Sequence, residues 1–316
     1  MKYCFGADVG GTTVKLGLFT EGGELVDKWE IVTRTENKGE AILPDVVKSL
    51  KAKIQEKGIM PDEVIGVGMG IPAPVNSEGI VEKTANLGWG YKEVKRELQD
   101  LTGWKVAIGN DANVAALGEM WKGAGHGEKN MIMVTLGTGV GGGAIIEGKP
   151  LIGAHGAGAE IGHICVNDSE ERVCGCGKKG CLEQYASATG IARLARERLR
   201  ADEKASMLRE KNLEQIDAKE VFDALKGGDE VAEEIVEEFG EYLAKGLAAV
   251  AVVLDPNLFV IGGGVSKAGE ILIPYVQKYY QKSAFFANKE VKFTIASIGN
   301  DAGICGAAKL LLDNQI

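Results

Sequence analysis

The chain lacks an excess of basic residues, an apolar N-terminal stretch and any long apolar run. Its 316 residues include 45 acidic and 36 basic side chains, for a formal net charge of −9. A dominant nucleic-acid-binding surface usually brings a basic excess, so this composition disfavours a nucleic-acid partner. No segment approaches the roughly 20 apolar residues that a membrane span requires, so we also expect no membrane partner.

The N-terminal residues 1–8 do not resemble the apolar core of a secretory signal peptide. We therefore expect a cytoplasmic protein, in which disulfide bonds are rare and closely spaced cysteines more often bind metal. Three of the six cysteines, Cys4, Cys165 and Cys305, stand apart from the others. They are interpreted as small apolar residues of the core.

Glycine is abundant instead, with 45 residues, about twice ordinary usage. The glycines gather mostly where apolar runs end, which favours backbone-mediated binding of a ligand such as phosphate. The clusters lie at 10–11, 66–70, 137–143, 153–162, 175–180 and 262–264.

Short apolar runs that alternate with amphipathic segments predict an α/β fold. A strand at 3–8, a glycine turn and a strand at 14–19 predict an antiparallel pair, and the same order recurs with strands at 131–136 and 144–147. Ligands of such folds bind at the carboxyl ends of the strands. Further strands are predicted at 25–33, 64–70, 105–109, 258–261 and 292–296, and helices at about 44–58, 91–101, 114–121, 188–204, 218–225, 230–254 and 301–312.

One imidazole and three thiols lie close together in the sequence: His163, Cys174, Cys176 and Cys181. This ligand set is typical of a closed, tetrahedral, structural Zn²⁺ site, so we predict one zinc ion per chain. Glycines between the cysteines allow a short loop to fold its sulfurs around one point. The alternative, a disulfide between neighbouring thiols, is less consistent with the nearby histidine.

The turn after the first strand is a candidate phosphate site. Asp8 precedes Gly10, Gly11 and Thr12; unpaired N–H groups of such a turn form an anion nest, and Asp8 could hold Mg²⁺ through water. An empty hairpin turn is the alternative. No Gly-Lys-Ser/Thr follows the glycines, so the turn is not a Walker loop.

Carboxylates are the remaining candidates. Asn110 and Asp111 stand where a strand ends and a helix begins, so they could cap the helix, accept a substrate proton, or do both. Glu160 and Glu183 flank the metal motif and, with His163, could bind a polyhydroxylated substrate.

Together these motifs resemble the ROK family of sugar kinases, repressors and related open reading frames, over essentially the whole chain. The segments 8–12 and 136–143 resemble the two phosphate motifs of the wider actin, hexokinase and heat-shock-protein superfamily, and 260–264 resembles its adenosine motif. Glu160-x-Gly-His163 and the run from Cys174 to Glu183 are similar to the family's own signatures. The resemblance is closest to the family's ATP-dependent glucokinases.

The resemblance implies a role for each matching position. Asp111 would be the general base that takes the proton of the sugar 6-hydroxyl. The sugar-binding residues would be Asn110, Asp111, Glu160, His163 and Glu183, and the zinc ligands His163, Cys174, Cys176 and Cys181. The residues around Mg²⁺ and ATP would be Asp8, Gly10, Gly11, Thr12, Thr138, Gly139, Gly262, Gly263 and Gly264.

It also implies a two-domain actin-like or hexokinase-like (ribonuclease H-like) α/β fold with an interdomain cleft and a structural zinc loop. Residues 1–110 would form a smaller domain, with the C-terminal helix at about 301–316 packing back on it, and 111–300 a larger domain carrying the zinc loop. Glucose and ATP would be the partners of a homodimeric enzyme of glycolysis.

Other functions remain open. The sugar could be another hexose or an N-acetylhexosamine. A sugar-responsive repressor of the same family would need an N-terminal helix-turn-helix, for which the motif at Asp8 leaves no room. An actin-like or chaperone-like ATPase would explain the phosphate motifs but not Glu160, His163 and Glu183. One departure from the family pattern is Ala73, which replaces a glycine and would be strained if its φ had to be positive.

Overall fold

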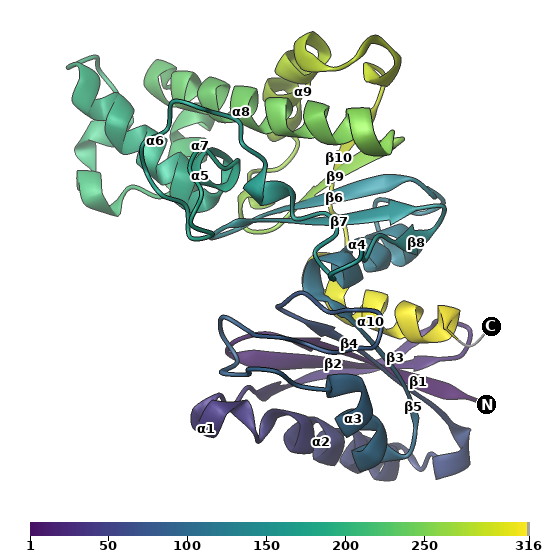
Figure 1. Cartoon of the computed structure of the whole chain (residues 1–316). Coiled ribbons are helices and arrows are strands. Elements are labelled where there is room, and N and C mark those ends of the chain that lie inside the picture. The colour runs from purple at the N-terminus through teal and green to yellow at the C-terminus, as the bar shows by residue number, and fades with distance from the viewer. Residues whose placement is uncertain (315–316) are drawn as a thin grey trace. The chain divides into compact units, whose positions relative to one another are not determined.

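The computed structural model describes residues 1–314, and the chain divides into two compact units (Figure 1). Unit 1 comprises Met1–Lys129, Gly143–Ala159 and the segment from Ser297 onward, and unit 2 comprises Asn130–Gly142 and Glu160–Ala296. The helix that begins at Asp111 was predicted to open the larger domain. In the structure it belongs to unit 1, where it packs against the C-terminal helix.

Unit 1 contains a five-stranded mixed sheet in the order β3-β2-β1-β4-β5. The first strands pair antiparallel, as the short turns between them predict, whereas β4 is parallel to β1 and β5 is parallel to β4. Parallel strands place their carboxyl ends at the same edge, so β1, β4 and β5 all end there. The strands are β1 Tyr3–Val9, β2 Thr13–Thr20, β3 Leu25–Val32, β4 Val64–Ile71 and β5 Lys105–Asn110.

Helices cover both faces of this sheet (Figure 1). The buried stripe of α2 (Ile42–Lys57) and the buried side chains of α3 (Val94–Thr102) join the strands in one hydrophobic core. The helix α2 ends in a Schellman motif, in which Gly58 takes a φ of 66° and the N–H of Ile59 bonds to the carbonyl of Ile54. The short α1 (Glu36–Gly39) precedes α2.

On the other face lies α10 (Ala302–Asp313), which packs on β1, β4 and α4 (Asp111–Lys122). Glycines make this close packing possible. A Cβ atom added at Gly6, Gly68 or Gly306 would fall far inside van der Waals contact with carbonyl oxygens of α10 or α4. The glycine cluster at 66–70, interpreted from the sequence as a ligand-binding feature, therefore includes a residue, Gly68, that allows the sheet to pack closely on α10.

The second sheet has the order β10-β9-β6-β7-β8, with β9 parallel to both β6 and β10. Helices of unit 2 pack on one another around the long α8. The strands are β6 Met131–Leu136, β7 Val140–Ile146, β8 Lys149–Pro150, β9 Leu258–Gly262 and β10 Lys292–Ile295, and the helices α5 Glu183–Ala186, α6 Ala188–Ala201, α7 Ala218–Lys226, α8 Glu230–Leu254 and α9 Leu272–Ser283.

Most predicted elements are confirmed within a few residues. The strand at 131–136 and the helix at 230–254 have the predicted bounds. The helix predicted from Tyr91 begins at Val94 instead, and the short strand β8 was not predicted. Across the described part of the chain, none of the helices combines the length and the apolar composition needed to cross a membrane.

The contact between α10 and α4 can be tested at Gly306. Alanine favours a helix over glycine intrinsically, but its Cβ would collide with the carbonyl oxygen of Val114. We expect Gly306→Ala to lower the free energy of unfolding by about 1–3 kcal/mol, as overpacking does. Denaturant unfolding followed by circular dichroism measures this.

Gly90→Ala is the matched control, because nothing lies within 4 Å of a Cβ at Gly90 and its φ is not positive. Equal stability of the two variants would contradict the proposed role of the Gly306 contact.

Candidate active site and metal cluster

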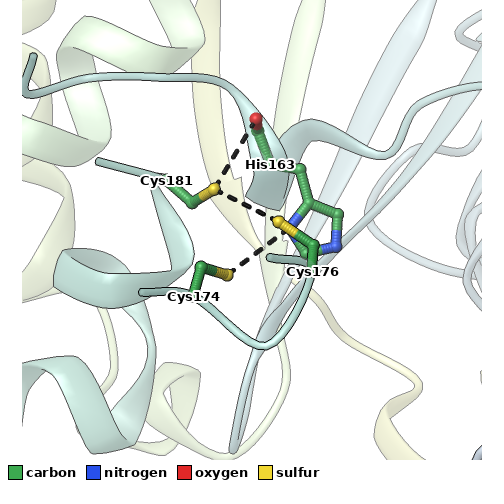
Figure 2. Close-up of side chains that lie close together, drawn as sticks. All are labelled: His163, Cys174, Cys176 and Cys181. Atoms are coloured by element: carbon green, nitrogen blue, oxygen red, sulfur yellow. Dashed lines mark hydrogen bonds between the residues drawn. The ribbon is translucent and has the colours of Figure 1, made fainter. Parts of the chain in front are cut away.

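The predicted metal ligands lie together in unit 2 (Figure 2). His163 ends a short 3₁₀ turn, Ile161–His163, and the cysteines lie on the loop that leads into α5. One ligand atom from each of the four residues lies within 4.8 Å of the others. The Sγ atoms of Cys176 and Cys181 are 3.6 Å apart, and Cys174 Sγ is 3.9 Å from His163 Nδ1.

These distances fit a tetrahedral zinc. Ligand atoms at 2.0–2.3 Å from such an ion lie about 3.5–3.8 Å from one another. The donor set, three sulfurs and one imidazole nitrogen, is also a common one for structural zinc. The cluster therefore suggests a structural metal, as the sequence predicts.

The loop folds tightly because glycines occupy its sharpest bends. Gly177 and Gly180 have φ values of 86° and 71°. The N–H of Cys174 donates to the carbonyl of Lys178, and a Cβ at Gly180 would collide with the carbonyl of Asn167. A side chain at Gly180 would therefore push Cys181 out of the cluster.

A buried carboxylate braces the same loop. Glu170 is 6% exposed and accepts hydrogen bonds from the Tyr185 hydroxyl at 2.6 Å and from the backbone and side chain of Arg172. Burial raises the pKa of Glu170, but these hydrogen bonds outweigh burial and lower the pKa to about 2. Sequence reasoning missed this group, because no spacing pattern links Glu170 to a tyrosine that it meets only through folding.

Glu183 faces two partners in unit 2. Its Oε2 accepts a hydrogen bond from the N–H of Val140 at 3.0 Å, and its Oε1 lies 3.6 Å from the Sγ of Cys174. Glu160, by contrast, is exposed and stands immediately before the 3₁₀ turn that carries His163. Glu160 thus precedes the predicted ligand His163 by three residues in the chain, whereas Glu183 lies close to the predicted ligand Cys174 in space.

The glycine turns of unit 2 follow strands, as predicted. Thr138 and Gly139 lie between β6 and β7, where the N–H of Gly137 bonds to the carbonyl of Gly139. Gly262 ends β9. Gly263 has a φ of 84°, and a Cβ there would lie 2.6 Å from the carbonyl oxygen of Leu136. No atom lies within 4 Å of a Cβ at Gly137 or Gly264, so both turns have an open side.

In unit 1, Asp8 lies near the end of β1 before the turn of Gly10, Gly11 and Thr12. The turn is closed by a hydrogen bond from Gly10 N–H to the Thr13 carbonyl. The residue that follows β3 also holds the turn, since the hydroxyl of Thr33 donates to the carbonyl of Gly10.

Asp8 is partly buried, and burial raises its pKa, while Lys15 on the neighbouring strand partly offsets that effect. A Cβ at Gly303, near the start of α10, would collide with the Asp8 carboxyl group. A carboxylate that has lost hydration gains most from a nearby cation, which is consistent with the predicted Mg²⁺ position.

Of the two polar residues at the start of α4, Asn110 is the one that caps it. Asn110 is the N-cap of α4, since its Oδ1 accepts hydrogen bonds from the N–H groups of Ala112 and Asn113. The Oδ1 of Asp111, the first helical residue, accepts from Ala112 N–H at 2.8 Å and from Asn110 Nδ2 at 3.0 Å. These bonds fix the orientation of the Asp111 carboxylate at the end of β5.

The departure at Ala73 causes no strain. Ala73 is not among the residues with positive φ, so a glycine is not required there. Its carbonyl accepts a hydrogen bond from Asn110 Nδ2 at 3.2 Å, which helps to hold the asparagine that orients Asp111.

The prediction for Cys4 and Cys305 as core residues is confirmed, but that for Cys165 is wrong. Cys165 is exposed, and its thiol bonds to Asp168 on the loop surface.

Comparisons with known proteins give a consistent result. The profile of the ROK family matches residues 4–314. A glucokinase of Halalkalibacterium halodurans is 40% identical over 99% of this chain and 96% of its own, and one of Thermotoga maritima is 38% identical over 97% and 96%. The crystal structure of a ROK family glucokinase from Streptomyces griseus, in complex with glucose and AMPPNP, superposes with a TM-score of 0.76 at 33% identity, covering 98% of both chains.

The metal cluster predicts a measurable metal content. We expect about one zinc ion per chain in the purified protein, and a loss of most of it in Cys176→Ser, because one of the four ligands is removed. Inductively coupled plasma spectrometry measures this. Cys165→Ser, an exposed cysteine beside the cluster, should keep its zinc. A folded wild-type protein that contains no zinc as purified and binds no added zinc would contradict the assignment.

Proposed function

Because the chain belongs to the ROK family, we propose that it is a sugar kinase that transfers the γ-phosphoryl group of ATP to the 6-hydroxyl of glucose. The main support is that the cluster of His163 and three cysteines occurs in the same chain as the glycine turns at 10–12 and 138–139. This chain matches glucokinases over 97–99% of its length. A simple ATPase would need the turns but not the cluster.

Phosphoryl transfer requires positioning and charge stabilisation more than covalent participation of the protein. Asp111 would act as the general base. As the bond from the sugar O6 to the γ-phosphorus forms and the bond from that phosphorus to the leaving oxygen of ADP breaks, the hydroxyl proton would pass to the Asp111 carboxylate. The hydrogen bonds to Asp111 Oδ1 would hold the carboxylate in one orientation for that transfer.

The other predicted residues would bind and orient. Backbone N–H groups of the turns at 10–12 and 138–139 would bind the phosphates of ATP, and the turn at 262–264 its adenosine. Mg²⁺, held through the Asp8 carboxylate, would supply neutralisation of phosphate charge. Asn110, Glu160, His163 and Glu183 would bind the remaining sugar hydroxyls, with the metal cluster fixing the loop that carries the last three.

Sugar selectivity tests the proposal directly. A screen of hexoses and N-acetylhexosamines with ATP should give the highest kcat/KM for glucose, with glucose 6-phosphate and ADP formed in equal amounts. Coupled assays for both products measure this. A higher kcat/KM for an N-acetylhexosamine would support the kinase activity but identify a different substrate. Formation of ADP without a sugar phosphate would overturn the proposal.

The role of Asp111 predicts a separation of binding from catalysis. Asp111→Asn keeps an oxygen that can accept from Ala112 and Asn110, so the local structure and the glucose Kd should change little. The kcat should fall at least about a hundredfold, because the proton acceptor is lost. Calorimetry and steady-state kinetics measure the two effects.

Asp100→Asn, which alters an exposed carboxylate on α3, is the control and should retain wild-type kcat. A near-normal kcat in Asp111→Asn would remove Asp111 from the role of base.

A further inference from the structure

The segment from Glu183 to Thr189 holds the second glycine turn at several points, all within unit 2. Val140 N–H donates to Glu183 Oε2 at 3.0 Å, and the N–H of Ala188 donates to the carbonyl of Gly137 at 2.8 Å. The hydroxyl of Thr189 donates to the carbonyl of Thr138, also at 2.8 Å. Hydrogen bonds therefore reach the turn between β6 and β7 at its beginning, its middle and its end.

The same segment starts at the metal cluster. Cys181 N–H donates to Gln184 Oε1 at 3.0 Å, and Cys174 Sγ lies 3.6 Å from Glu183 Oε1. The carboxylate of Glu183 thus lies between a predicted zinc ligand on one side and the backbone of the turn on the other. A shift of Cys174 would move the acceptor of Val140.

The far end of the segment is equally fixed. Ser187 is fully buried and caps α6, since its Oγ accepts from Gly190 N–H at 3.0 Å. The hydroxyls of Ser187 and Thr189 lie 2.9 Å apart. Thr189 can therefore donate to Thr138 from a position that the helix start determines.

The turn lies in direct contact with this segment. A Cβ at Gly139 would collide with Glu183 Oε2, so only a glycine lets the carboxylate reach Val140. The side of the turn near Gly137 is open. The contacts with the segment 183–189 thus orient the turn while leaving room for a ligand.

We propose that the segment 183–189 is a clamp through which the metal cluster positions the second glycine turn for binding of nucleotide phosphates. Glu183 and Thr189 are its positioning residues. The inference rests on the proposed function only in taking the turn as a phosphate site, and it does not depend on which sugar is used. It adds to the predicted sugar contact of Glu183 a role toward the nucleotide.

The clamp makes metal and nucleotide binding reciprocal. If the metal orders the turn, the metal raises nucleotide affinity, and the nucleotide must raise metal affinity by the same factor. Breaking the clamp should reduce that factor without removing either site.

The test measures binding of AMPPNP with Mg²⁺ by calorimetry in the absence of sugar, so that sugar contacts do not enter. Zinc-loaded wild-type protein should bind the analogue at least about fivefold more tightly than zinc-depleted protein whose fold is verified by circular dichroism. In Glu183→Ala, the ratio of the AMPPNP affinity of the zinc-loaded form to that of the zinc-depleted form should fall toward one.

Thr189 gives an independent arm in the zinc-loaded protein. Thr189→Val replaces the hydroxyl by a methyl group of similar size at an exposed site. It should weaken AMPPNP binding about threefold to tenfold, the effect of one lost hydrogen bond. Thr189→Ser restores the donor and should bind as the wild type does. In the wild type, AMPPNP should slow the transfer of zinc from the protein to a zinc-selective dye. In Thr189→Val, AMPPNP should slow this transfer less.

Equal AMPPNP affinity in zinc-loaded and zinc-depleted wild type would overturn the proposal. If zinc-depleted protein unfolds, equal affinity of Thr189→Val and Thr189→Ser would overturn it instead. These outcomes are separate from the proposed function. If the wild type does not phosphorylate glucose but zinc still raises its AMPPNP affinity, glucose is rejected as the substrate and the clamp is still supported.

Discussion

Three sulfurs and one imidazole nitrogen lie within 4.8 Å of one another in unit 2. The chemistry proposed for this unit depends on that arrangement. The chain between Glu160 and Glu183 contains only a 3₁₀ turn and isolated bridges, so its backbone hydrogen bonds belong to turns and not to a long helix or a sheet. A bound metal fixes such a loop by joining distant points, and its binding energy is then part of the folding energy. The Glu170 carboxylate also braces the loop through its hydrogen bonds to Tyr185 and Arg172.

This constraint also determines the position of the carboxylate that follows the cysteines. Glu183 lies two residues after Cys181, so the position of the cluster also fixes the position of Glu183. A carboxylate has several acceptor sites, so the hydrogen bond from Val140 leaves capacity for a substrate hydroxyl. In the proposed reaction, Glu183 would therefore contact the sugar and also orient the turn that binds phosphate.

Glycine has two separate uses in this protein. At Gly137 and Gly264 the space beside the backbone is open, as a ligand-binding turn requires. At Gly6, Gly68 and Gly306 the same space is filled by the backbone of another element. The high glycine content therefore reflects both close packing of α10 and turns at strand ends, and composition alone does not separate the two.

The sequence by itself determined most of the elements and the set of predicted metal ligands, because their signals are local. The stripe of α8, the Schellman end of α2 and the spacing from Cys174 to Cys181 each depend on residues near in the chain. Only the tertiary structure decided the rest. The exposure of Cys165, the bond of Glu183 to Val140, the pairing of Glu170 with Tyr185 and the close contact of Gly306 with α4 join residues far apart in sequence. No periodicity records such contacts, since they arise only when packed elements bring those atoms together.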